Sequence, residues 1–226
     1  VTVSLTGANP IELSATGDVT ILADLNLDGI EGINRNNNPP DNDALSKQDL
    51  MGKLGGGFGG NRWNNTDVGS GGGPSNLTSG TLNGGGRPWS GHYDPRGDGI
   101  TSGWEPSGGG YGGNGARAQS TSYNTGWSTQ YSVPAGGLTY GDIDVTHLLG
   151  GSGGGGGDWA TGGTGGGAIK IVSAATLTLG GDVTAVGGRG GEWEENNNNE
   201  AWRSGGSGSG GAIHLKGENV VINAGV

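Results

Sequence analysis

The stretch AIKIVSAATLTLGGDVTAVG, residues 168–187, decides the fold of this chain of 226 residues. Its apolar residues recur at every second position, which is the period of a β-strand with one buried face. Many of them are Ile or Val, which strands favour. Because Gly and Asp interrupt the pattern, the stretch predicts two or three short strands joined by tight turns.

The same pattern occurs at both ends of the chain. PIELSATGDVTILADLNLDG (residues 10–29) aligns with residues 168–187 without a gap, and AIHLKGENVVINAGV (residues 212–226) aligns after one residue is deleted. A unit of about 20 residues cannot bury its apolar face alone, so such units stack on one another. We therefore expect an all-β fold of parallel β-solenoid or β-helix rungs with almost no α-helix. An antiparallel sandwich of hairpins is the alternative, because its strand spacing is similar.

A long glycine-rich segment separates the first two units. We expect residues 1–29 to form N-terminal rungs and residues 168–226 to form C-terminal rungs that pack with them as one domain. Residues 30–167 are then a glycine- and Trp-rich insertion. Of the 226 residues, 57 are Gly, and blocks such as GGSGGGGG predict extended polyglycine II-type helices, which bond laterally because no Cβ keeps their backbones apart. Flexible linkers are the alternative interpretation.

Composition excludes several classes of partner and site. The net charge of −10 argues against nucleic acid and anionic membranes as partners. Without Cys, the chain has no disulfide, thiolate ligand or thiol nucleophile. No apolar run reaches the ~20 residues of a membrane span. The chain starts at Val1 without a leader segment, so we expect a mature secreted chain or an excised fragment.

Two segments carry a resemblance to known proteins. GGTGGGAIKIVSAATLTLGGDVTAVGGRGG and GGSGSGGAIHLKGENVVINAG are similar to glycine-rich surface proteins that many bacteria secrete, whose repeats read GGGAIxIxAxxLTLxGxxxAxGG. This resemblance implies an extracellular or cell-surface location and a repetitive architecture. In composition and block spacing alone, the chain also resembles the polyglycine-helix adhesins of phage tail fibres. That second resemblance implies receptor recognition by loops at one end of a bundle.

One motif suggests a cofactor. DLNLDG places Asp24, Asn26 and Asp28 in the D-x-N-x-D-G opening of a calcium loop. Arg35 stands where the bidentate Glu of such a loop belongs, and the flanks read as strands rather than helices. Calcium is thus a possible cofactor, and an ordinary solvent-facing strand end is the other interpretation.

Aromatic and acidic loops are the candidates for ligand binding. Trp89, His92, Tyr93 and Trp104 lie in or beside RPWSGHYDPRGDG (residues 87–99), and aromatic rings next to charged groups stack on sugars. Alternatively, the Trp side chains cap glycine helices. The loop GGEWEENNNNEAWR is rich in carboxylates, the groups that hydrolyse glycosides in pairs. It has no His partner, so we predict no catalytic residues.

The two ends of the chain are apolar and uncharged. VTVSLTG and VVINAGV contain neither charged residues nor Pro, which normally protect exposed strand edges. We expect these ends to pair head to tail between subunits and to make a filament. The assembly residues are then Val1, Val3, Leu5, Val220, Ile222 and Val226.

Together these patterns predict a non-enzymatic extracellular structural protein. It would be a subunit of a surface fibre, filament or matrix, with further copies of itself as the main partner. The alternative is an adhesin that binds glycans or a receptor through its Trp-rich loops. A polysaccharide-degrading enzyme is the third and weakest possibility.

Overall fold

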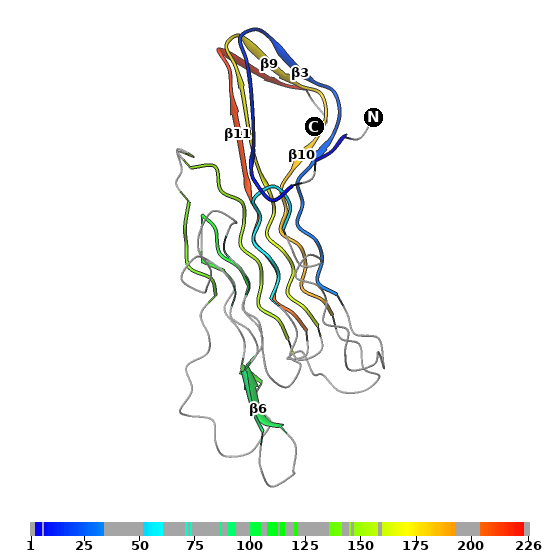
Figure 1. Cartoon of the computed structure of the whole chain (residues 1–226), viewed down its shortest axis with the longest axis vertical. Helices are drawn as coiled ribbons and strands as arrows, with labels where there is room; N and C mark the ends of the chain where they lie inside the picture. Colours follow the sequence, from blue (N-terminus) through cyan, green and yellow to red (C-terminus); the bar gives the residue numbers. More distant parts are fainter. Residues whose placement is uncertain are drawn as a thin grey trace.

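The computed structural model describes residues 3–5, 7–33, 52–60, 71, 73, 86, 90–93, 100–104, 108–112, 114–115, 120–121, 136–141, 145, 147–157, 160–192 and 204–223. Within these ranges the chain forms twelve β-strands and no helix, so the described part is all-β (Figure 1). Accordingly, none of the described residues form a helix that could cross a membrane.

The repeat units supply eight of these strands, and β1 (Val3–Ser4) precedes them. Unit 1 contains β2 (Ile11–Ala15), β3 (Val19–Ile21) and β4 (Leu25–Asn26). Unit 2 contains β8 (Ala168–Ser173), β9 (Thr176–Leu179) and β10 (Val183–Thr184). Unit 3 contains β11 (Ala212–Lys216) and β12 (Asn219–Ile222). We call β1 and the three units the stack.

The units pair in parallel in three sheets, with strand orders β11-β8-β2, β12-β9-β3 and β1-β4-β10. In Figure 1 the sheets form the sides of a triangle. The register joins Ile11 to Ile169 and Val19 to Leu177, the same residues that the ungapped alignment brings together. On the other side of unit 2, Ile213 pairs with Ile169 and Val220 with Leu177. Unit 3 is therefore one residue shorter than unit 2, and the difference lies between β11 and β12. Parallel pairing excludes a sandwich of hairpins for these units.

Unit 2 holds the centre of the apolar core because it has a neighbour on both sides. The buried core cluster consists of Leu25, Leu27, Leu54, Ile169, Ile171, Leu177 and Leu179. Leu177 is 0% exposed, whereas Ile222, which continues the column of Leu179, is 59% exposed. The same alternating pattern therefore gives a dry interior in the middle of the stack and bare apolar side chains at its ends.

The chain leaves the stack twice, each time from the same corner. It departs after β4 and after β10, and it returns at β8 and β11. The residues next to these crossings run as extended segments side by side below the triangle (Figure 1). We call these segments the glycine bundle; they are residues 27–33, 54–60, 150–157, 160–167, 185–192 and 204–211.

The hydrogen-bond period changes where the stack meets the bundle. Leu25, Leu27 and Gly29 donate their backbone N–H groups to the segment that follows β9, which is the two-residue period of a strand. The next donor is Gly32, three residues on, and it bonds to the carbonyl of Arg189 at 2.7 Å. From Gly29 onward the pairing therefore repeats every third residue.

Segment 160–167 lies inside the bundle and bonds to five neighbours. Its N–H groups donate in three directions, to segments 27–33, 54–60 and 204–211. Its carbonyls accept from segments 150–157 and 185–192. The segment is buried throughout, so backbone pairing replaces the water that its polar groups would otherwise need.

Side chains are nearly absent from this interior for a steric reason. A Cβ added to Gly162 would overlap the backbone of Gly154, and one added to Gly165 would overlap that of Gly151. Among the few side chains that are buried there, Thr161 and Thr164 extend the backbone pairing. The Oγ1 atoms of Thr161 and Thr164 accept hydrogen bonds from the N–H groups of Ile33 (2.8 Å) and Ile30 (2.6 Å), respectively. Each threonine also donates its own N–H to the carbonyl of the same isoleucine, so both its side chain and its backbone bond to segment 27–33.

A separate antiparallel sheet contains β5 (Ser90–Tyr93), β6 (Ile100–Trp104) and β7 (Ser120–Thr121). It lies at the end of the molecule opposite the triangle (Figure 1). The strands pair in the order β5-β6-β7, with an irregularity between His92 and Tyr93.

Candidate functional site

The two ends of the stack are the most distinctive surfaces of the described structure. At the end formed by unit 3, Ile213, Val220 and Ile222 continue columns that are buried in unit 2, yet they are 38%, 44% and 59% exposed. At the opposite end, Leu13 continues the column of Ile171 and is 48% exposed. Each end thus presents edge strands together with bare inward-facing apolar side chains.

Four of the predicted assembly residues lie at these ends. Val3 belongs to β1, and Leu5 packs partly buried against the core cluster. Val220 and Ile222 belong to β12, the edge strand of unit 3. Val1 and Val226 lie outside the described residues.

An outward-facing row of polar side chains crosses the sheet β11-β8-β2. Glu12, Lys170 and His214 are register partners, and Lys170 Nζ lies 2.7 Å from Glu12 Oε1. His214 ends the row at the edge of the stack. Its Nδ1 is buried and has no hydrogen-bond partner within the part of the chain that the structure describes.

The predicted calcium ligands bond to the backbone of unit 2. Asp24 Oδ1 accepts from the N–H of Asp182 at 2.9 Å, and Asp28 Oδ1 accepts from the N–H of Val186 at 2.7 Å. Asn26 Nδ2 donates to Asp28 Oδ2 at 3.1 Å. Among the described residues no group of three acidic or His side chains is arranged to hold a metal ion. The structure therefore shows Asp24 and Asp28 linking neighbouring units, with Asn26 bonded to Asp28 in its own unit, and calcium binding stays a prediction.

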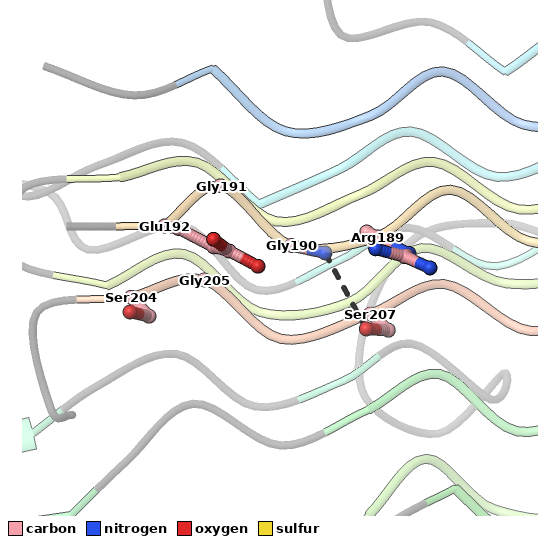
Figure 2. A pocket seen from close by; sticks show the side chains of 7 residues that line it. All are labelled: Arg189, Gly190, Gly191, Glu192, Ser204, Gly205 and Ser207. Carbon is pink, nitrogen blue, oxygen red and sulfur yellow. Dashed lines mark hydrogen bonds between the residues drawn. The ribbon is translucent and has the colours of Figure 1, made fainter. Parts of the chain in front are cut away.

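A polar groove of about 600 Å³ opens on the side of the glycine bundle (Figure 2). Arg189 and Glu192 come from segment 185–192, and Ser204 and Ser207 come from the neighbouring segment. Gly190 donates its N–H to Ser207 Oγ at 3.4 Å. Glu192 is the one carboxylate among the lining residues that the structure describes, and Glu194, Glu195 and Glu200 of the same acidic loop lie outside the described residues.

The antiparallel sheet gathers most of the predicted glycan- or receptor-binding residues. His92 and Tyr93 belong to β5, and Trp104 belongs to β6, where it pairs with Ser90. Trp89 lies outside the described residues. The structure therefore brings three of the four residues onto two neighbouring strands.

No family model, curated protein or solved structure matches this chain. The resemblance to secreted glycine-rich bacterial surface proteins therefore stays a prediction.

Sequence patterns did not reveal a polar cluster beside the bundle. Tyr140 donates its hydroxyl to the carbonyl of Gly150 at 2.6 Å and also meets the hydroxyls of Ser152 and Ser209. Burial raises the pKa of Tyr140 above its ordinary value, although the two serine hydroxyls oppose this shift. Tyr111 packs edge-on against Tyr140, with ring centroids 5.1 Å apart. The arrangement holds a neutral phenol against a glycine segment and is structural.

Proposed function

We propose that this chain is a non-enzymatic extracellular structural protein, a subunit of a surface fibre, filament or matrix that assembles head to tail. One observation carries the proposal: the apolar columns of the stack continue to both ends, where Ile213, Val220, Ile222 and Leu13 are exposed and the other unit 1 residues of these columns are half-buried. Proteins normally protect open sheet edges with charge, Pro or a capping element. Bare edges of complementary character at opposite ends favour association between copies.

In this proposal the stack is a β-solenoid and the glycine bundle consists of polyglycine II-type helices. The three-residue hydrogen-bond period of the bundle supports the second part, because a polyglycine II-type helix has three residues per turn. Such helices bond to neighbours on several sides at once.

The extracellular location is part of the same proposal. Its support is the composition, in which Gly, Asn, Ser and Thr dominate, and the resemblance to secreted bacterial surface proteins.

The test is assembly of the purified chain, followed by light scattering and negative-stain microscopy over a range of concentrations. We expect filaments from the parent protein and none from Val220→Lys with Ile222→Lys, because both charges would enter the apolar columns. Val221→Lys is the matched control: Val221 is 43% exposed on the same strand but pairs with Thr178 in an outward-facing row. A parent protein that stays monomeric at high concentration, or a double variant that still forms filaments, contradicts the proposal.

A second function, glycan or receptor binding, is favoured by the sheet of β5, β6 and β7. This sheet lies away from the stack, so it stays accessible in a head-to-tail fibre (Figure 1). We expect Trp104→Ala to abolish binding on a glycan array without changing assembly. If the parent protein binds no glycan and no bacterial or host surface, this second function is wrong.

A further inference from the structure

We call one turn of the triangle, with one strand on each of its three sides, a level of the stack. We infer that neighbouring subunits jointly form one such level: unit 3 of one copy supplies the strands on two sides, and β1 of the next copy supplies the strand on the third. This inference rests on the proposed head-to-tail assembly and specifies its register. It identifies the occupant of the exposed apolar end as the N-terminal end of a second copy of this chain.

The first argument is the shape of the two ends. β1 pairs with β4 and lies one level before unit 1, on one side of the triangle. Among the described residues, no strand occupies the other two sides at that level. Unit 3 shows the opposite arrangement, since β11 and β12 occupy those two sides and no described strand of unit 3 occupies the side of β1. Among the described strands, each end therefore leaves open the sides that the other end occupies.

The second argument is the continuity of the apolar columns. Within the chain, Ile11 stacks on Ile169 and Ile169 on Ile213, while Val19 stacks on Leu177 and Leu177 on Val220. A copy added at one strand spacing, about 4.8 Å, sets its own Ile11 on Ile213 and its own Val19 on Val220. The exposed side chains of both ends then become buried in the pattern that buries unit 2.

The third argument is the polar row on the outside. In the proposed register, Glu12 of the next copy follows His214, so a carboxylate meets a row that ends in Lys170 and His214. Glu12 already makes such a contact within its own chain, at 2.7 Å from Lys170. The row then repeats as Glu12, Lys170 and His214 from copy to copy along the fibre. The alternation of inward and outward side chains fixes which residues pair, because a shift of one residue would bring outward-facing polar side chains into the core.

A cross-linking experiment tests this register, since the chain contains no Cys of its own. Ser14 and Lys216 both pair with Val172, from opposite sides. Within one chain they are two strand spacings apart, about 9.6 Å, which exceeds the reach of a disulfide. In the proposed contact, Lys216 of one copy is the direct neighbour of Ser14 of the next copy, at about 4.8 Å, within the Cα separation that a disulfide spans.

We expect Ser14→Cys with Lys216→Cys, after mild oxidation, to give a ladder of disulfide-linked multimers on a non-reducing gel. The control variant is Ser14→Cys with Val221→Cys. Val221 belongs to β12, on another side of the triangle, so this pair should give no ladder. Both variants keep the inward-facing columns intact.

The outcomes separate the two proposals. If filaments form without the predicted cross-link, or if the control pair gives an equal ladder, the inference that two copies share one level is wrong. The proposed fibre function is not contradicted by either result. Absence of filaments and of multimers at any concentration overturns both. In a second measurement, removal of residues 1–4 should raise the critical concentration for assembly about tenfold or more, and an unchanged value also overturns the shared level.

Discussion

The stack and the glycine bundle solve the same problem by opposite means. Both bring extended backbones together and pair their N–H and C=O groups. In the stack, alternating side chains fill the space between sheets with Leu and Ile, and the central ones are almost fully buried. In the bundle, the space between segments is removed because the residues have no side chain to fill it.

This difference determines how each region responds to change. An apolar core loses stability gradually, in proportion to the methyl groups that are removed. A bundle of backbones has no such gradation, because a single added carbon atom collides with groups that cannot rotate away. We therefore expect the bundle to be the more sensitive region, although it contributes little apolar area.

The largest effect is expected from Gly162→Ala with Gly165→Ala in the interior segment. Each Cβ would overlap backbone atoms of segment 150–157, so we expect a loss of at least about 5 kcal/mol, enough to unfold an ordinary domain. Thermal unfolding followed by circular dichroism measures this loss. Gly17→Ala is the control, since its Cβ would meet nothing within 4 Å. If the double variant melts like the parent protein, backbone contact does not hold the bundle together.

A smaller effect is expected from Leu177→Ala in the centre of the stack. Leu177 is 0% exposed, so its truncation should cost about 2–5 kcal/mol. Leu13→Ala is the comparison at the end of the stack, where the side chain is 48% exposed and the loss should be about 1 kcal/mol. Denaturant titration of the monomer gives both values. Equal losses would show that the units contribute alike and that the centre of the stack is not its core.

The smallest effect is a pH dependence at the edge of the bundle. The pKa of Tyr140 is raised by burial, so the neutral phenol stabilises the fold at pH values below about 10, the ordinary pKa of Tyr. This contribution is lost as the pH rises through the raised pKa. Tyr140→Phe lacks the hydrogen bond to Gly150 and should be about 1 kcal/mol less stable at pH 8.

The stability difference between the parent protein and Tyr140→Phe should therefore shrink as the pH rises above about 10. Melting temperatures of the two proteins between pH 8 and pH 11 measure it. A difference that stays constant or grows over this range contradicts a protonated, buried Tyr140.

Much of the stack was predictable because alternation and repetition are local signals. The ungapped alignment of residues 10–29 with 168–187 gave the strand register that the structure shows. The alignment of the three units also places Glu12, Lys170 and His214 at the same position. A single polar residue at an outward-facing position is common, so the row was not predicted before the strand order was known.

Other features were not predictable from the sequence. A glycine block has no side-chain pattern, so nothing in it indicates which other block it pairs with. The role of Tyr140 depends on Ser152 and Ser209, which approach it only after three segments have met. Thr161 and Thr164 did carry a signal, since the spacing of TGGTGGG matches the three-residue hydrogen-bond period, but recognising it required that period to be known first.

Both excursions from the stack leave and return at one corner, and this placement has an evolutionary consequence. The excursion from residue 27 to 167 is far longer than the one from 185 to 211, yet both bring the chain back in register. A tandem duplication that spans one turn of the triangle and its loop would therefore lengthen the stack and thicken the bundle in a single event. The loop could then change in length without altering the cross-section of the stack.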